Sequence, residues 1–425
     1  MKRLVIILIL LSISLCIVPI SATYCQGGRE SELLSPALKV IAWNTDMVKS
    51  EITGKNVVFS PEDFKTLSGK GNIDYLEIES LPETSSGRLM LGTLEVFEGQ
   101  KITSSSLSSL VFVPNAEECE ASFAFNIDGD EYGYSCVIYY LTDENYAPTS
   151  AGVDESFYNI KTYKNISFYG KMRCDDPEND AVKYEITQIP KNGLLTVKSR
   201  SSGEYIYTPT KNFAGKDSFS YVAVDKYGNR SAEITVDVSV SRSKSGVVFR
   251  DLIGERAQYA AITLHEKGIM TGFVDGYGDV YLPNMSVYYG DFLKIALEAA
   301  GTEGDVTASK EIEGEIGKIP SEYRDSLASA YSMGYIELED VVSFDCTRMI
   351  TRAEAWVIVN KILDISPSKN MPVFSDIDNM PDEALSAVSA LINAGFMIDG
   401  GEASADEDLT RADAAILLSE LLNRI

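Results

Sequence analysis

The chain has 425 residues, and its 63 acidic and 37 basic side chains give a formal net charge of −26. Such a chain repels nucleic acid and anionic lipid, which argues against a nucleic-acid-binding protein. The length predicts about three domains, and the apolar content of 45% lets each bury a core. With one histidine and no Cys-x-x-Cys pair, the sequence lacks the usual zinc sites and has little for a histidine-dependent triad.

Residues 1–22 are typical of a secretory signal peptide. Lys2 and Arg3 precede a long apolar run, and small residues follow it up to Ala22. We therefore expect cleavage after Ala22 and export of the mature chain, with an uncleaved membrane anchor as the alternative. No later segment is apolar for long enough to cross a bilayer.

Cysteines are sparse, and five of them remain after the expected cleavage. Because five is odd, at least one thiol stays free or pairs between chains. Cys119 and Cys136 lie near the two ends of a predicted hairpin. A disulfide between them is therefore one of the alternatives that the spacing leaves open.

Residues 24–242 have the pattern of short antiparallel strands. Tyr, Phe and Val recur at every second position over residues 205–240, between Gly, Asp and Asn turns. The segment also repeats itself, and the matching runs are SLPETSSGRLML with QIPKNGLLTV, LVFVPN with YIYTPT, and ASFAFNID with DSFSYVAVD. We predict two tandem all-β sandwiches, over residues 24–146 and 147–242.

The second unit, with the run YTPTKNFAGKDSFSYVAVDKYGNRS, resembles the cadherin-like and immunoglobulin-like (Ig-like) repeats of bacterial surface proteins. The first unit resembles them more loosely. The resemblance implies spacers, adhesive modules or polymer-binding modules, which are often calcium-dependent.

Acidic loops make Ca²⁺ the candidate cofactor, because clustered carboxylates suit a hard, oxygen-seeking cation. The predicted ligands are Asp176, Glu178, Asp180 and Asp225. The first unit offers a similar set, namely Asp128, Asp130 and Glu131. The alternative is a solvated acidic turn that binds no metal.

After a short linker at 243–247, the apolar period changes to 3.6 residues. Three segments share one layout of helix, Gly-apolar-apolar turn, loop and capped helix, and they span 248–300, 314–364 and 373–425. We expect the left-handed conformation where the first helix of each segment ends, at Gly268, Gly334 and Gly395.

The second helix of two segments begins with an arginine. In MITRAEAW, Thr351 and Glu354 form a predicted capping box around Arg352. In LTRADAA the corresponding residues are Thr410, Arg411 and Asp413. Arginine is mildly unfavourable at the positive end of a helix, by some tenths of a kcal/mol. It is, however, a good carboxylate receptor there, because the N–H groups and the guanidinium favour the same anion. The alternative is that each arginine pairs with an acid across the bundle.

These motifs resemble the S-layer homology domain over residues 248–425. The resemblance implies an all-α pseudo-threefold bundle with one helix from each repeat at its centre. It also implies binding of secondary cell wall polysaccharide, typically pyruvylated. The resemblance implies that Arg352 and Arg411 of this chain hold the pyruvyl carboxylate. It also implies that the turns at Gly334 and Gly395 offer N–H groups to the sugar.

This sequence departs from the family in the first repeat. Tyr288 and Tyr289 replace the Thr and Arg of the second helix, although both rings could stack on a sugar. The tryptophan usual in the first helix is replaced in every repeat, by Arg256, Glu322 and Glu383. Anchoring is still expected, but the three repeats need not all bind, and the first repeat departs most from the family.

We predict a non-catalytic protein of the cell wall or S-layer of a Gram-positive-type bacterium. It would display its two sandwiches outward and could self-associate in a surface layer. One alternative is an anchored adhesin or scaffold that binds a protein or a glycan. Another is a polysaccharide hydrolase, because acidic residues are plentiful, although no motif with Cys, His or Gly-x-Ser-x-Gly occurs.

Overall fold

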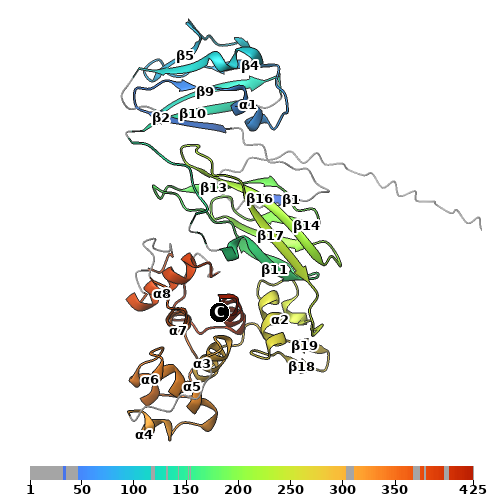
Figure 1. The fold of residues 1–425 in the computed structure, drawn as a ribbon, viewed down its shortest axis with the longest axis vertical. Helices are drawn as coiled ribbons and strands as arrows, with labels where there is room; N and C mark the ends of the chain where they lie inside the picture. Colours follow the sequence, from blue (N-terminus) through green and yellow to red (C-terminus); the bar gives the residue numbers. More distant parts are fainter. Residues whose placement is uncertain are drawn as a thin grey trace, which may run out of the picture.

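A computed structural model gives the fold of the chain. It describes residues 32–34, 46–115, 120–130, 133–141, 143–151, 153, 155–302, 311–366, 374–377, 380–396 and 402–424. Along the long axis, a first β-sandwich, a second β-sandwich and a helical bundle follow one another (Figure 1). The predicted order of two β-sandwiches before a helical unit is confirmed, but the helical unit also contains a short two-stranded sheet and the first sandwich contains a helix. The predicted signal peptide lies outside the described residues.

The first sandwich packs a five-stranded sheet, β2-β10-β9-β4-β7, against a four-stranded sheet, β3-β8-β5-β6. Its elements are β2 (Asp46–Ile52), β3 (Val57–Val58), α1 (Pro61–Ser68), β4 (Tyr75–Ser80), β5 (Gly87–Leu91), β6 (Leu94–Glu95), β7 (Lys101–Thr103), η1 (Ser104–Ser109), β8 (Leu110–Pro114), β9 (Glu120–Ile127) and β10 (Tyr134–Leu141). Alternation along β9 buries Phe123 and Phe125 in the core, as the period of a strand requires.

The second sandwich has two four-stranded sheets, β11-β17-β16-β13 and β1-β14-β15-β12. Its elements are β1 (Glu32–Leu34), η2 (Glu155–Phe157), β11 (Asn159–Tyr163), β12 (Phe168–Lys171), β13 (Val182–Gln188), β14 (Gly193–Val197), β15 (Glu204–Pro209), β16 (Gly215–Asp225) and β17 (Ile234–Ser241). Strand β1 comes from the start of the chain and pairs antiparallel with β14.

The two sandwiches share one topology. Apart from β1, the first strand of each sandwich runs parallel to its last strand, β2 beside β10 and β11 beside β17. The order β3-β8-β5 in the first unit corresponds to β12-β15-β14 in the second. The sequence correspondences therefore fall on equivalent strands, β5 with β14, β8 with β15 and β9 with β16, so the internal repeat is confirmed.

The helical bundle contains three inner helices, each packed against an outer helix of a different repeat. The elements are η3 (Arg250–Leu252), α2 (Gln258–Lys267), β18 (Phe273–Asp275), β19 (Gly278–Val280), α3 (Tyr289–Ala299), α4 (Glu313–Ile316), α5 (Ser321–Ser332), α6 (Leu338–Val342), α7 (Arg352–Leu363), α8 (Asp382–Asn393) and α9 (Arg411–Arg424). Inner helix α3 packs on α5, α7 on α8, and α9 on α2, while α3, α7 and α9 contact one another.

A ring of backbone hydrogen bonds joins the three repeats just before their inner helices. The N–H of Val287 donates to the carbonyl of Leu409 at 3.0 Å, Leu409 donates to Ile350 at 2.8 Å, and Ile350 donates to Val287 at 3.0 Å. All three side chains are buried. The bundle is therefore pseudo-threefold, and each repeat contacts both of the others.

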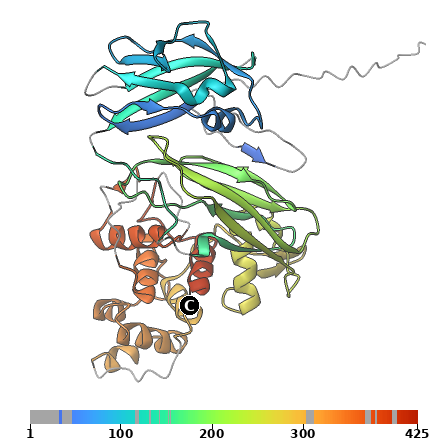
Figure 2. The ribbon, with the colours of Figure 1, turned by 45° about the horizontal axis from the view of Figure 1, so that its top comes forward.

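The second sandwich lies directly against the bundle (Figure 2). Tyr163 and Ile166 of the sandwich pack on the bundle core. The guanidinium of Arg173 donates to the carbonyl of Ile392 at the end of α8, at 2.7 Å. This interface is both apolar and polar, so it fixes the orientation of the sandwich on the helices.

The structure bears on the expectations about a disulfide and about membrane-spanning segments. Cys136 is a buried free thiol on β10, so it does not form the disulfide with Cys119 that the spacing left open. Cys119 lies outside the described residues. Its side chain points into the core beside apolar neighbours, where burial raises the pKa of the thiol above its ordinary value. Among the described helices, none combines the length and the apolarity needed to span a bilayer.

Candidate functional site

The predicted helix caps are present at two of the three inner helices. Thr351 caps α7, and Glu354 completes the capping box by accepting the N–H of Thr351 at 2.9 Å. At α9, the hydroxyl of Thr410 accepts the N–H of Asp413 at 3.2 Å. These local predictions are confirmed, and they place Arg352 and Arg411 at the first position of their helices.

The first N–H groups of these helices, however, are not open to a ligand. The N–H of Arg352 donates to the carbonyl of Glu407 at 2.9 Å, and the N–H of Ala353 donates to that of Ala405 at 2.9 Å. The N–H of Arg411 likewise donates to Met285 at 2.8 Å. The prediction that the helix N–H groups and the guanidinium act together on one anion is therefore wrong. Packing between repeats uses these donors.

The predicted turn glycines have the expected backbone conformation. Gly268, Gly334 and Gly395 have φ values of +78°, +74° and +97°. Their N–H groups donate to helix carbonyls of His265, Tyr331 and Ile392, so they close the helix ends. The N–H groups of these glycines themselves are therefore engaged within the protein. Binding of a sugar at the turns of Gly334 and Gly395 stays a prediction.

Each inner helix begins against the loop of another repeat, and we name these three contacts after the helix. The α7 junction joins Arg352 to the third repeat, the α9 junction joins Arg411 to the first repeat, and the α3 junction joins Tyr289 to the second repeat. Each junction therefore combines residues of two repeats.

At the α7 junction, the arginine is paired within the protein. Arg352 Nη1 lies 2.9 Å from Asp413 Oδ2 of α9, and its guanidinium lies 5.6 Å from the ring centroid of Trp356. The Arg352 side chain is only 18% exposed. This ion pair across the bundle is the alternative that the sequence left open.

At the α9 junction, the arginine lies against carbonyls and rings. Arg411 Nε donates to the carbonyl of Tyr281 at 2.9 Å, and Nη2 donates to that of Thr271 at 2.7 Å. Its guanidinium lies 4.7 Å from the Tyr281 ring centroid and 5.1 Å from that of Phe273. Burial lowers the pKa of Arg411, against the opposing effects of Tyr281 and Asp251. No ion pair joins Arg411 to a carboxylate within the part of the chain that the structure describes.

At the α3 junction, the helix begins with Tyr289 instead of an arginine, and the guanidinium there comes from Arg348. Tyr289 is buried, and the guanidinium of Arg348 lies 4.2 Å from its ring centroid. Arg348 Nη1 also contacts both carboxylate oxygens of Glu354, at 2.7 and 3.0 Å. Sequence reasoning missed Arg348. Its signal is its place four residues before Arg352, where the chain crosses to the neighbouring helix.

A second missed group is the aspartate that precedes the first helix of two repeats, Asp251 in VFRDL and Asp376 in VFSDI. Asp251 accepts the N–H groups of Tyr281 and Leu282, at 2.9 and 2.8 Å. Asp376 accepts those of Ala403 and Ser404, both at 2.8 Å. Leu282 and Ser404 have positive φ values, +60° and +47°. These carboxylates therefore hold the loops that lead into the ring of repeats.

The acids predicted to bind calcium are held by protein groups. Asp176 accepts N–H groups from Glu178 and Asp180, Asp180 pairs with Lys226 at 2.7 Å, and Asp225 accepts from Asn229. The Tyr146 N–H donates to Glu178. Within the described residues, no three acidic, His or Cys side chains are grouped to hold a metal ion. These contacts give no support to calcium, which stays a prediction.

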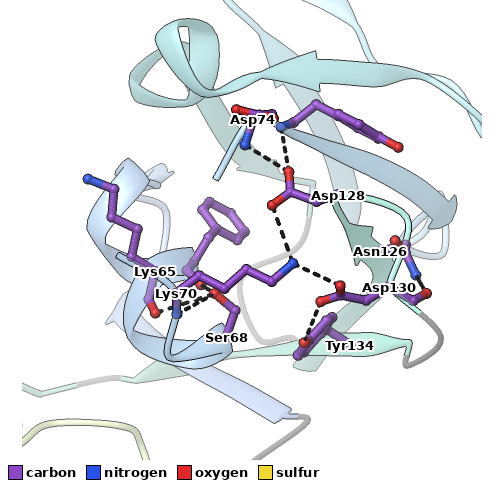
Figure 3. A network of polar contacts seen from close by, with 10 residues as sticks. Lys65, Ser68, Lys70, Asp74, Asn126, Asp128, Asp130 and Tyr134 are labelled. Atoms are coloured by element: carbon purple, nitrogen blue, oxygen red, sulfur yellow. Dashed lines mark hydrogen bonds and ion pairs between the residues drawn. The ribbon is translucent and has the colours of Figure 1, made fainter. Parts of the chain in front are cut away.

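The acidic turn of the first sandwich has its own cation (Figure 3). Lys70 Nζ lies between two carboxylates, 2.8 Å from Asp130 and 3.3 Å from Asp128. Asp128 also accepts the N–H groups of Asp74 and Tyr75. The ammonium lies between the two carboxylates and offsets part of their negative charge. Glu131 lies outside the described residues.

A small cavity lies between the second sandwich and the bundle, with a volume of about 30 Å³. Tyr169, Arg256 and Ser419 are among its lining residues. That volume holds one or two water molecules, far less than a sugar. Arg256, which stands where the S-layer homology motif that the sequence resembles has tryptophan, therefore lies at an interface between domains.

The comparisons with known proteins bear on the middle of the chain. A family model for a bacterial Ig domain matches residues 145–239. No match to the S-layer homology domain is found, and the search of curated proteins gives no match.

Solved structures with similar parts include fibronectin(III)-like modules of Clostridium thermocellum CbhA, at 12% identity over 50% of this chain and 95% of that chain, with a TM-score of 0.20. Drosophila N-cadherin EC1-3 matches at 12% identity over 46% and 65%, with a TM-score of 0.20. The endo-fucoidan hydrolase MfFcnA4 matches at 16% identity over 46% and 28%, with a TM-score of 0.18. We infer nothing about function from scores this low. What the comparisons establish is that residues 145–239 are similar to a bacterial Ig domain.

Proposed function

We propose that this chain is a non-catalytic cell-surface protein whose helical bundle binds an acidic wall polysaccharide and whose sandwiches extend away from the wall. The similarity of the middle sandwich to bacterial Ig domains supports an extracellular place, since such domains are typical of extracellular proteins. The helical repeats support the anchor through their likeness to the S-layer homology motif and their pseudo-threefold ring.

The observation that carries the proposal is the environment of Arg411. Its guanidinium is partly buried, and it bonds to neutral carbonyl groups rather than to a carboxylate among the described residues. Next to it, apolar side chains remain in contact with solvent: Phe273 is 45%, Leu282 41% and Met285 44% exposed. A ligand carboxylate would compensate the guanidinium, and the apolar surface suits the faces of sugar rings.

The negative charge of the chain opposes an anionic polymer at a distance. Salt screens exposed charges beyond roughly 8 Å at physiological ionic strength, so the attraction has to be local. A hydrogen bond to a charged group contributes about 1.5–3 kcal/mol. Replacing Arg411 should therefore weaken binding roughly tenfold or more.

The test is sedimentation of the mature protein with purified cell walls, before and after the carboxylate-bearing polymer is stripped. We expect co-sedimentation with intact walls and loss of binding to stripped walls. Equal binding to both preparations would refute the proposal. Mass spectrometry of the native protein tests export separately, because a chain that keeps Met1 inside the cell cannot be an exported wall protein.

A further inference from the structure

We propose that the outer edge of β14 in the second sandwich is a docking site for strand β1 of a second copy of this chain. In this structure the same edge holds the chain's own β1, so two copies can exchange their first strands. The occupant is the extended segment Glu32–Leu34, which pairs with the edge through its backbone. This inference is independent of what the helical bundle binds.

The two sandwiches cover this edge in different ways. In the first sandwich, β5 corresponds to β14 and is covered by β6, which follows it directly in the chain, so that Leu91 pairs with Leu94. In the second sandwich, the chain passes from β14 to β15 without an intervening strand. Strand β1 takes the place on β14 that β6 has on β5. The second sandwich therefore receives this strand from outside its own stretch of the chain.

Strand β1 is far from β14 in the sequence. Leu34 pairs with Leu195, which lies 195 − 34 = 161 residues later, and the first sandwich from β2 to β10 lies between them. Figure 1 places β1 at the second sandwich, next to β14. The strand pairing is the same whether β1 comes from its own chain or from another copy. Exchange between copies therefore conserves the hydrogen bonds of this edge.

Strand β14 is well placed to accept an extended segment. All five of its residues pair with β15 on one side, and on the other side β1 pairs with Leu195, Thr196 and Val197. Leu195 and Val197 are buried in the core of the sandwich, which holds the strand in position. A sheet edge presents backbone N–H and C=O groups that favour the addition of another strand. The edge of β14 therefore has the geometry of an acceptor.

The charges near this edge favour pairing between copies. Glu32 pairs in register with Val197, and the exposed Lys198 follows Val197 directly. A second acid, Glu30, precedes the strand. Copies with a net charge of −26 repel each other at a distance. An acidic donor segment beside a basic position of the acceptor provides a local attraction that opposes this repulsion.

The balance between the chain's own strand and an exchanged strand depends on protein concentration. A three-residue strand near the start of a chain opens at lower cost than the strands of a core. A short tether holds a segment at an effective concentration on the order of 1 mM. At about 0.1 mM protein, roughly one edge in ten should therefore hold the strand of another copy. A higher local concentration raises this share.

The test mixes two mature full-length variants that each carry one introduced thiol. Leu33→Cys places the thiol on β1, and Thr196→Cys places it on β14 at the partner position of the register. Opposite residues of an antiparallel pair are close enough for a disulfide. In the mixture, a disulfide between these two positions forms only between copies. The matched control is Thr208→Cys, because Thr208 is also half-buried but lies on β15, between β14 and β12.

Under mild oxidation at about 0.1 mM protein, we expect several-fold more linked dimer of Leu33→Cys with Thr196→Cys than with Thr208→Cys. The amount should rise with concentration, and mass spectrometry of the linked peptides identifies the two positions. Thermal unfolding shows that each variant is folded. Equal linkage with Thr196→Cys and Thr208→Cys, or none with either, would overturn the inference.

The double variant Leu33→Cys/Thr196→Cys checks the starting structure. At micromolar concentration, far below the effective concentration of the chain's own strand, we expect its disulfide to form within one chain. A folded double variant that forms no such disulfide would show that β1 does not lie on β14, and it would overturn the inference as well. Wall binding is measured separately, by sedimentation, so these results do not decide the proposed function.

Discussion

Replacing Lys70 with methionine should loosen the acidic turn of the first sandwich. The change keeps the apolar stem of the side chain and removes the ammonium that lies between Asp128 and Asp130. The two carboxylates then repel each other with no cation between them. The N–H groups of Asp74 and Tyr75, which Asp128 holds at 2.7 and 3.0 Å, lose part of their support.

The magnitude follows from the exposure of these groups. Exposed ion pairs contribute about 0.2–1 kcal/mol each, and hydrogen bonds to charged groups about 1.5–3 kcal/mol. The side chains of Lys70, Asp128 and Asp130 are 31%, 21% and 26% exposed, which places them between these cases. We expect a local loss of about 1–2 kcal/mol, which is roughly a five- to thirtyfold change in the opening equilibrium.

The pH dependence gives this prediction a sign. Burial raises the pKa of Asp128, but the N–H groups of Tyr75 and Asp74, together with Lys70, outweigh it and lower the pKa overall. Its contribution to stability is therefore complete above the unfolded value of about 3.9 and is lost as the pH falls through the folded pKa. Burial lowers the pKa of Lys70, but Asp130 and Asp128 raise it overall. The Lys70 contribution is thus complete below about pH 10 and is lost as the pH rises through its folded pKa.

Hydrogen–deuterium exchange of peptides from β4 and β9 measures the effect in the whole mature chain. Lys65→Met is the matched control, because Lys65 lies nearby and pairs with Glu62, whose side chain is 76% exposed. We expect faster exchange in Lys70→Met at neutral pH and little change in Lys65→Met. The difference from the wild type should shrink as the pH falls from about 4 through the lowered pKa of Asp128 in the folded protein. Equal exchange in the two variants at neutral pH would show that the ammonium does not hold this turn.

Two further predictions concern the second sandwich and its contacts. At Gly395, where φ is +97° and a Cβ would lie 2.5 Å from Phe157 Cζ, alanine should cost about 1–3 kcal/mol more than at Gly268, where φ is +78° and the space is open. Urea denaturation measures both, and equal losses would show that Phe157 yields freely. If calcium binds near Asp176, millimolar calcium should raise the melting temperature over that in chelator, and Lys226→Met should enlarge the rise because it frees Asp180. Equal temperatures in both proteins would leave the acidic turn as a solvated face.

The elements that local rules define were predictable from the sequence. Alternation gave the strands of both sandwiches, and the internal repeat gave their equivalent positions. The capping box at Thr351 and the left-handed glycines also follow from residues close together in the chain.

The partners of the arginines were not predictable in this way, because they depend on which repeats meet. Arg352 contacts an acid 61 residues away, and Arg411 contacts a carbonyl 140 residues away. The first N–H groups of the inner helices also donate to carbonyls that are distant in the sequence, in another repeat. In the sequence of one repeat, the first N–H groups of the inner helix have no evident partner. In the folded bundle they donate to carbonyls of another repeat.

The exchange of outer helices around the ring has a consequence for folding and for the evolution of chain length. In an open array of repeats, each unit touches only its neighbours, and units can be added or lost at the ends. In this bundle α9 packs on α2, so the last helix closes on the first. Removing one repeat would remove its helix contacts with both of the other repeats, and a fourth repeat could not be added without breaking the contact between α9 and α2. We therefore expect the bundle to unfold as one unit, with its repeat number fixed at three.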